Sequence, residues 1–293
     1  MRVAHGINLA QLRAFVAVVD AEGFGAAASE LGITQSAVSH AIGALERTVG
    51  ARVLHRNGAG PTITTFGASM LEHARSALAA TDAIGDLAAA QHSAPRGTVR
   101  LAAPPTVCQG LLPELIADWS IRLPRVTVRV FEGEDDEIAD WLGAHSVEAA
   151  VLVDPPRSTP GELLATDSFH VLLPRRHPLA DRAELQLSDL SDEALLFSGG
   201  SCEQPIHDLY RNAGLRMTLT HQVRELSTLF AMVTSGLGIT IVPSLVRSIL
   251  GPDLALVTLR PTHQRRLVLT GPADTPWHPA VTALIQDVQA RSY

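Results

Sequence analysis

The sequence of 293 residues contains no lysine, so all 23 of its basic side chains are arginine. Acidic residues number 30, and the resulting net charge of −7 argues against a general nucleic-acid coat protein. The charge is unevenly placed, because residues 1–66 carry five arginines against four acidic residues, a balance of +1 that leaves −8 for the remainder. This asymmetry fits a DNA-binding unit at the N-terminus of an acidic body.

Long apolar runs are also missing, since none reaches the ~18 residues that a membrane-spanning helix needs. The start of the chain, Met1–Ala10, is polar and has no apolar signal-peptide core. We therefore expect a cytoplasmic protein with no membrane partner. Aromatic residues make up 4% of the chain and apolar residues 46%, which predicts cores built mainly from Ala, Leu and Val. The length suggests about two domains.

Sequence motifs for catalysis, metal binding and cofactor binding are absent as well. The two cysteines, Cys108 and Cys202, have no zinc spacing, and the acidic run Glu132–Glu137 lacks the spacing of a calcium loop. There is no Walker loop, no G-x-S-x-G elbow and no H-E-x-x-H frame. We expect neither an enzyme nor a protein with a resident metal or cofactor, and no structural disulfide in a reducing compartment.

What is present begins with three short helical patterns. Apolar residues recur at helical spacing over Asn8–Asp20, and Phe24–Leu31 is a short Ala-rich helix that ends at Gly32. Thr34 is a favourable N-cap for a third helix over Gln35–Thr48, whose Val38, Ile42 and Leu45 share one face. Ala51–Thr65 contains Gly58, Gly60 and Pro61, which predicts two short strands around a turn.

The second half of the chain alternates between strands and helices. A long Ala-rich helix is expected over Phe66–Gln91, followed by a boundary at His92–Gly97. Alternation of this kind is typical of parallel α/β sheets. The elements that we expect are strands at 98–103, 126–131, 149–153, 170–173, 194–197 and 239–242, and helices at 107–121, 135–142, 204–212, 226–234 and 276–289.

The third helix presents a polar front opposite its apolar rear face. Its exposed positions are Gln35, Ser36, Ser39 and His40, side chains that can distinguish base pairs when a helix enters the major groove of DNA. Thr34 at the helix N-terminus, and Arg52 and Arg56 in the strand pair, are candidates for contacts with the DNA backbone. From spacing alone, an ordinary amphipathic helical hairpin explains the same pattern equally well.

A family resemblance favours the DNA-binding interpretation. Residues 8–67 closely resemble the N-terminal domain of LysR-type transcriptional regulators, and the segments Pro174–Leu179 and Gly236–Pro243 extend the resemblance over nearly the whole chain. His40 departs from the family, which often has Arg or Gln there, and Gly25 stands where Ser or Thr is common. The matching N-terminal positions are Leu9, Leu12, Phe15, Val18, Gly23, Phe24, Ala27, Ala28, Leu31, Gln35, Ser36, Ala37, Val38, Ser39, Ile42, Leu45, Glu46, Gly50, Leu54, Arg56, Thr64 and Gly67.

The resemblance implies an α/β protein with three parts. They are a winged helix-turn-helix at residues 1–65, a linker helix at 66–92 that pairs two subunits, and an effector domain at 97–293 like periplasmic binding proteins. Lobe I of that domain is expected at about 97–166 and 268–293, and lobe II at about 167–267. The implied partners are double-stranded promoter DNA, a small-molecule effector and further copies of the chain in a homodimer or homotetramer, with RNA polymerase as another candidate.

By the family's architecture, the effector lies between the two lobes at the carboxyl ends of strands. Pro104 and Pro105 remove amide donors that would hold an anion, and Glu132 and Asp154 would repel one if both face the cleft, so a neutral or basic effector is an open alternative. Backbone amides and hydroxyls at 199–202 are candidates for holding a carboxylate, although a simple glycine-rich turn explains them too. The candidate effector-binding residues are Pro105, Thr106, Cys108, Glu132, Asp154, Ser198, Gly199, Gly200, Ser201 and Cys202.

Cys202 supports a second interpretation of the signal that is sensed. Its setting, Leu196–Cys202, resembles the site of the reactive cysteine in peroxide-sensing members of the family, and a helix N-terminus favours thiolate. No second cysteine follows nearby, because Cys108 belongs to the other lobe, so an ordinary packing thiol is the simpler interpretation. A solute-binding protein with a helical head is a more distant rival, against which the missing signal peptide argues.

Overall fold

The computed structural model describes residues 6–57, 60–90, 94–200, 202–217 and 219–291. The chain forms two compact units, a first made of Met1–Ser93 with Gly143–Ser146 and a second made of Ala94–Leu142 and Val147–Tyr293. Within the described ranges, no helix is long and apolar enough to cross a membrane.

The first unit begins with three helices in the expected places, α1 (Leu9–Asp20), α2 (Phe24–Leu31) and α3 (Gln35–Val49). Asn8 caps α1 in a reciprocal capping box with Gln11, and Gly32 ends α2 with a φ of 66°, in the left-handed region that favours glycine. The tight turn after Gly32 brings the short α2 to pack against both α1 and α3.

The strand pair and the long helix complete the first unit. Strands β1 (Leu54–Asn57) and β2 (Gly60–Ile63) pair antiparallel, as expected for a wing, and α4 (Thr65–Ala90) follows directly. The core of this unit joins the apolar faces of α1, α2 and α3 to the first half of α4. Phe15, Val38 and Leu45 are completely buried in it.

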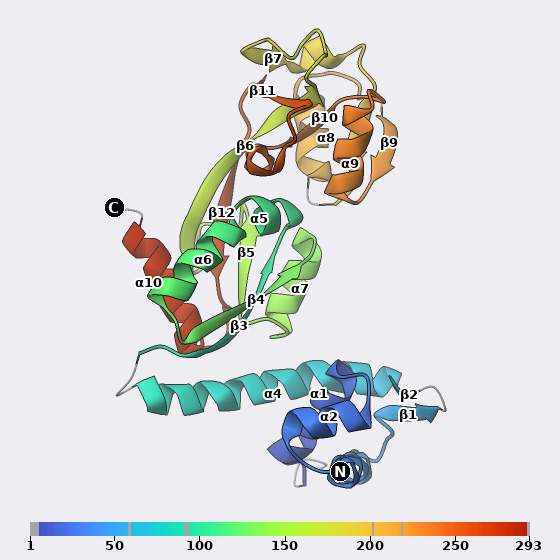
Figure 1. Cartoon of the computed structure of the whole chain (residues 1–293), viewed down its shortest axis with the longest axis vertical. Helices are drawn as coiled ribbons and strands as arrows, with labels where there is room; N and C mark the ends of the chain where they lie inside the picture. Colours follow the sequence, from blue (N-terminus) through green and yellow to red (C-terminus); the bar gives the residue numbers. More distant parts are fainter. Residues whose placement is uncertain (1–5, 58–59, 91–93, 201, 218, 292–293) are drawn as a thin grey trace. The chain divides into compact units, whose positions relative to one another are not determined.

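The first lobe of the second unit is a sheet covered by helices on both faces. Strands β3 (Gly97–Ala103), β4 (Val126–Glu132) and β5 (Ala149–Val153) are parallel, as the alternating pattern predicts. Successive residues of a strand face opposite sides of the sheet. In β3, Leu101 therefore joins the core under α6 (Leu112–Arg122) and α10 (Pro279–Arg291), whereas Ala102 packs under α7 (Asp135–Gly143). Figure 1 shows α6 and α10 on one side of this sheet and α7 on the other.

The second lobe repeats this layered arrangement. Helices α8 (Glu203–Asn212) and α9 (Leu226–Thr234) pack in two separate apolar cores, to which Val171 and Leu172 contribute on opposite faces of β6 (Glu162–Pro174). The remaining elements of this lobe are β7 (Glu184–Gln186), η1 (Leu187–Leu190), β8 (Leu195–Ser198), β9 (Leu219–Val223), β10 (Thr240–Pro243), η2 (Ser244–Ile249) and β11 (Leu254–Arg260).

One continuous sheet joins the two lobes. The 13-residue strand β6 pairs antiparallel with β12 (Gln264–Thr270) in its first half and with β10 and β11 in its second half. Because β12 also pairs antiparallel with β5, the sheet is mixed, and the parallel pairing that the alternating pattern predicts holds for β3, β4 and β5 but not for the strands that join the lobes. Figure 1 shows β6 and β12 running from one lobe into the other.

Two further expectations about individual elements are wrong. The single helix expected at 107–121 is split into α5 (Pro105–Gly110) and α6, and the break at Leu111 leaves the α-helical region. Gly110 packs so closely against the Leu245 carbonyl that a side chain there would collide with it. The strand expected at 170–173 is only the buried end of β6, and β7, β9, β11 and β12 are not among the expected strands.

Candidate DNA interface and effector cleft

The N-terminus of α3 is fixed by its own cap. The Thr34 hydroxyl accepts a hydrogen bond from the Ala37 amide at 3.2 Å, and it lies 2.9 Å from the Ser36 hydroxyl. The Thr34 side chain is therefore engaged in holding the first turn of the helix, and contact with a phosphate would add to this role.

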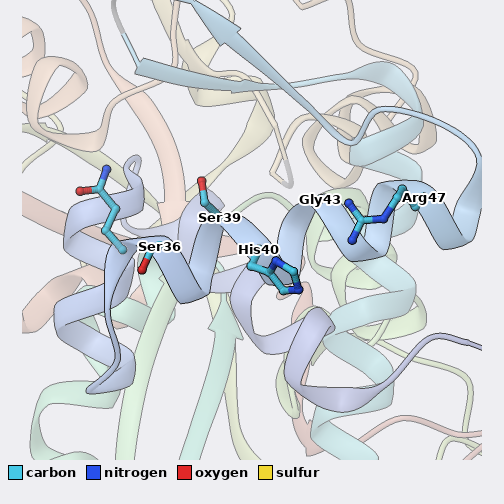
Figure 2. A pocket seen from close by; sticks show the side chains of 6 residues that line it. Ser36, Ser39, His40, Gly43 and Arg47 are labelled. Carbon is cyan, nitrogen blue, oxygen red and sulfur yellow. The ribbon is translucent and has the colours of Figure 1, made fainter.

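Four of the predicted DNA-contacting side chains lie together on the exposed face of α3. Val38, Ile42 and Leu45 are completely buried on its other face, so packing fixes the orientation of the helix. Figure 2 shows Ser36, Ser39 and His40 in order along the outer face, followed by Gly43 and Arg47. Together with Gln35, these residues line one surface hollow.

Sequence reasoning missed the last two members of this face. Positions 36, 40, 43 and 47 follow each other at steps of three or four residues, which is the spacing of one helical face. Gly43 has no side chain that could contact DNA, and Arg47 enters the sequence analysis only through the net charge of residues 1–66. The periodicity that picks out Ser36 and His40 would also have picked out Arg47.

The wing is joined to the same helix through Glu46. Its Oε1 accepts a hydrogen bond from the Val53 amide at 3.1 Å, just before β1 begins. Arg52 is exposed, and its carbonyl accepts a bond from the Thr64 hydroxyl at 2.8 Å. Arg56 lies opposite Pro61 in the β1–β2 ladder, and its side chain lies outside the described part of the chain.

Three predicted effector residues lie on α5, directly after β3. Pro105 is the first residue of this helix, and Thr106 is buried with a hydroxyl that has no hydrogen-bond partner among the described residues. The Cys108 thiol donates to the Ala103 carbonyl at 3.3 Å. Burial, with a smaller contribution from the charge of Glu132, raises the pKa of Cys108 to about 12. Cys108 is thus a packing thiol that stays protonated.

Glu132 ends β4 and faces other carboxylates. Burial raises the pKa of Glu132, and the charges of Glu225 and Glu134 raise it further. Because Glu225 immediately precedes α9 in the second lobe, negative charge reaches the space between the lobes from both sides. This arrangement disfavours an anion beside Glu132.

Asp154 has a structural role in the sheet. Its carboxylate accepts a bond from the Arg266 amide at 2.7 Å, while its own amide donates to the Arg266 carbonyl at 2.8 Å. The residue has a φ of 46°, which aspartate tolerates better than most side chains. Asp154 therefore ties the end of β5 to β12.

The glycine-rich turn of the second lobe faces a carboxylate of the chain itself. Gly200 has a φ of 100°, and a side chain there would collide with the carboxylate of Glu134 from the first lobe. The Gly199 amide donates to the Val223 carbonyl at 3.0 Å. Ser201 and the side chain of Ser198 lie outside the described residues. The position expected to hold a ligand's carboxylate is thus next to Glu134.

Cys202 precedes α8 and lies near a buried ion pair. Burial raises the pKa of its thiol to about 11, although the charge of Arg265 acts in the opposite direction. Arg265 forms a bidentate ion pair with Asp167, with bonds of 2.8 and 2.7 Å, and both side chains are 2% exposed. The two residues are directly opposite each other where β6 and β12 connect the lobes.

Comparisons with known proteins match both units. Residues 9–68 match the family model described as a bacterial regulatory helix-turn-helix protein of the lysR family, and residues 92–292 match the LysR substrate binding domain. A probable hydrogen peroxide-inducible genes activator of Mycobacterium leprae is 35% identical over 80% of this chain and 78% of its own length.

Two solved structures are similar over almost the whole chain. Full-length CbnR in a complex with its target DNA has 25% identity and a TM-score of 0.71, over 98% of this chain and 100% of the other. A hydrogen peroxide-bound OxyR mutant from Corynebacterium glutamicum has 26% identity and a TM-score of 0.60, over 97% of this chain and 93% of the other.

Proposed function

The chain belongs to the LysR family of bacterial transcriptional regulators, and we propose that α3 reads promoter DNA while a small molecule bound between the lobes of the second unit modulates that binding. The observation that carries the DNA-binding part is the polar outer face of α3, held outward by its buried rear face. An α-helix of this kind fits the major groove with its N-terminal residues against the base edges.

We assign individual roles on this basis. Gln35, Ser36, Ser39 and His40 contact base edges, and Thr34, Arg52 and Arg56 contact the DNA backbone. The domain limits given above, 1–65, 66–92 and 97–293, belong to the same proposal. So do pairing of subunits through α4, assembly into a homodimer or homotetramer, action in the cytoplasm where promoter DNA is found, and the absence of enzymatic activity.

Ser39 offers a direct test of the base-contacting face. A duplex enriched from a random library by the full-length wild-type protein serves as the DNA probe. We expect Ser39→Ala to weaken binding to this duplex by about 5- to 30-fold at physiological salt, because one polar contact with a base is lost. Ser191→Ala, which changes an exposed serine of the second unit, is the matched control. Equal gel shifts for Ser39→Ala and the wild type would refute the assignment.

The charges between the lobes constrain the effector. Glu132, Glu134 and Glu225 contribute negative charge, and Pro104 and Pro105 offer no amide hydrogens at the start of α5. A neutral or basic effector is therefore favoured over an anion. The hydroxyl of Thr106 has no hydrogen-bond partner in the described part of the chain and is a suitable hydrogen-bonding group for such a molecule.

A second candidate function, peroxide sensing by Cys202, is favoured by the similarity to the Mycobacterium leprae activator. The thiol chemistry of this structure opposes it, because a pKa of about 11 leaves little thiolate at neutral pH. If Cys202 is the sensor, peroxide must change DNA binding by the wild-type protein and not by Cys202→Ser. An identical response of both proteins to peroxide would exclude this function.

A further inference from the structure

We propose that Arg47 is an additional DNA-contacting residue, which binds a backbone phosphate at the wall of the major groove and is given its position by the absence of a side chain at Gly43. The inference rests on the proposed function, since it assumes that α3 enters DNA. It is carried by the geometry of the exposed face of α3.

Gly43 lies at the centre of that face. On a helical wheel its direction falls close to those of Ser36 and Arg47 and opposite the buried Val38 and Leu45. Glycine in the interior of an exposed helix is unfavourable relative to alanine. Gly43 belongs to a regular helix without a positive φ, so the backbone does not require glycine there.

The neighbour that a side chain at position 43 would meet is Arg47. A Cβ at position 43 would stand 3.4 Å from Nη1 of Arg47, and it would meet no other described neighbour within 4 Å. Figure 2 shows the Arg47 guanidinium turned back along the helix toward Gly43 and His40. Helical side chains tilt toward the N-terminus, so Arg47 covers position 43 by default. A Cβ there would be in van der Waals contact with the guanidinium, and a side chain longer than alanine would take its space.

The guanidinium is available for a ligand. Arg47 is exposed, and it makes no hydrogen bond or ion pair with any described residue. An alternative without a ligand is that the positive charge of Arg47 only stabilises the negative, C-terminal end of the α3 dipole. The direction of the side chain argues against this, because the guanidinium points away from the last turn and along the outer face.

The position along the helix favours a phosphate over a base. Gly43 lies eight residues after Gln35, which is about 12 Å along the axis, a distance comparable to the width of the major groove. If the N-terminal residues of α3 reach the bases, a guanidinium at the level of Gly43 lies beside the groove wall, where the phosphates are. The fork of an arginine suits bidentate binding of a phosphate.

The test measures DNA binding by four full-length proteins at 50 and 200 mM salt. They are the wild type, Arg47→Gln, Gly43→Leu and the double variant, each titrated onto the library-selected duplex and a shuffled duplex. Neutralising one phosphate contributes a factor of about 3.5 to the loss of affinity between these salt concentrations. We therefore expect Arg47→Gln to weaken binding to both duplexes by the same factor. The ratio of the affinities at 50 and 200 mM salt should fall by about 3.5-fold for each recognition helix that contacts the DNA.

Gly43→Leu tests the positioning role of the glycine. The leucine takes the space of the guanidinium, so we expect the same loss as for Arg47→Gln and no further loss in the double variant. Arg13→Gln is the matched control, because it removes a positive charge from the same unit, where Arg13 is paired with Asp82 on α4. It is expected to keep the wild-type salt dependence.

Distinct outcomes overturn distinct claims. If the wild-type protein enriches no duplex, DNA binding fails and the role of Arg47 falls with it. If a duplex is enriched but Arg47→Gln binds like the wild type, only the Arg47 proposal is overturned. If Arg47→Gln loses affinity only for the selected duplex, Arg47 contacts a base and not a phosphate. If Gly43→Leu lowers the affinity as much in the Arg47→Gln protein as in the wild type, Gly43 does not position Arg47.

Discussion

The ion pair between Asp167 and Arg265 gives a sharp stability prediction, because it is buried at the junction of the two lobes. Replacing Asp167 by asparagine keeps the shape of the side chain and removes its charge. The guanidinium of Arg265, which is 2% exposed, then keeps its charge without a counter-ion. Desolvation of that charge is no longer offset.

The size of the effect follows from the geometry. Charges about 4 Å apart attract by ~4 kcal/mol at an effective dielectric constant of 20. Removing one partner of a buried pair typically costs about 3–5 kcal/mol. For a unit of this size, each kcal/mol lowers the melting temperature by roughly 2–4 °C, so we expect Asp167→Asn to lower it by about 10 °C.

Scanning calorimetry of the full-length protein measures this shift, and the transition of the first unit serves as an internal reference. Asp208→Asn is the matched control, since its partner is Arg211 at 2.6 Å and the two side chains are 40% and 70% exposed. An exposed pair contributes at most about 1 kcal/mol. If Asp167→Asn lowers the melting temperature no more than Asp208→Asn does, the buried pair does not hold the lobe junction.

The remaining predictions concern the thiol of Cys202 and the long helix. In a Cys108→Ser background, Cys202 should react with iodoacetamide about 100-fold more slowly at pH 7.5 than a free thiol, with a rate that keeps rising toward pH 11; a plateau below pH 8 would refute the raised pKa. Because the folded protein holds this proton more tightly than the unfolded chain, whose thiol titrates near pH 9, the free energy of unfolding should fall from pH 9 to 11. In α4, Gly67→Ala should destabilise the first unit by about 1–3 kcal/mol, because its Cβ would collide with the Val53 carbonyl. Gly85→Ala in the same helix meets nothing within 4 Å and should stabilise by about 0.5–1 kcal/mol; equal urea midpoints for the two variants would contradict the packing at Gly67.

The N-terminal unit could be predicted closely because its signals are local. Asn8, Gly32, Thr34 and Gly50 mark helix ends through capping and left-handed backbone, which depend only on neighbouring residues. In the second unit, β11 and β12 were missed although both are largely buried. Their partner β6 lies about 80 to 100 residues earlier in the chain, and the spacing of apolar residues within a short segment does not indicate a pairing over that distance.

The same distinction between local and distant signals explains which parts of the two sites could be predicted. The outer face of α3 belongs to one helix, so a single period of 3.6 residues places Ser36, Ser39 and His40 together, and it also brings in Arg47. The cleft is built from residues far apart in the chain. The neighbourhood of Gly200 is set by Glu134, a carboxylate 66 positions away, and no spacing rule connects the two. The glycine-rich turn at Gly200, taken by itself, favours a bound carboxylate, but the carboxylate of Glu134 already lies beside it. The effector must therefore be compatible with the negative charge of Glu134.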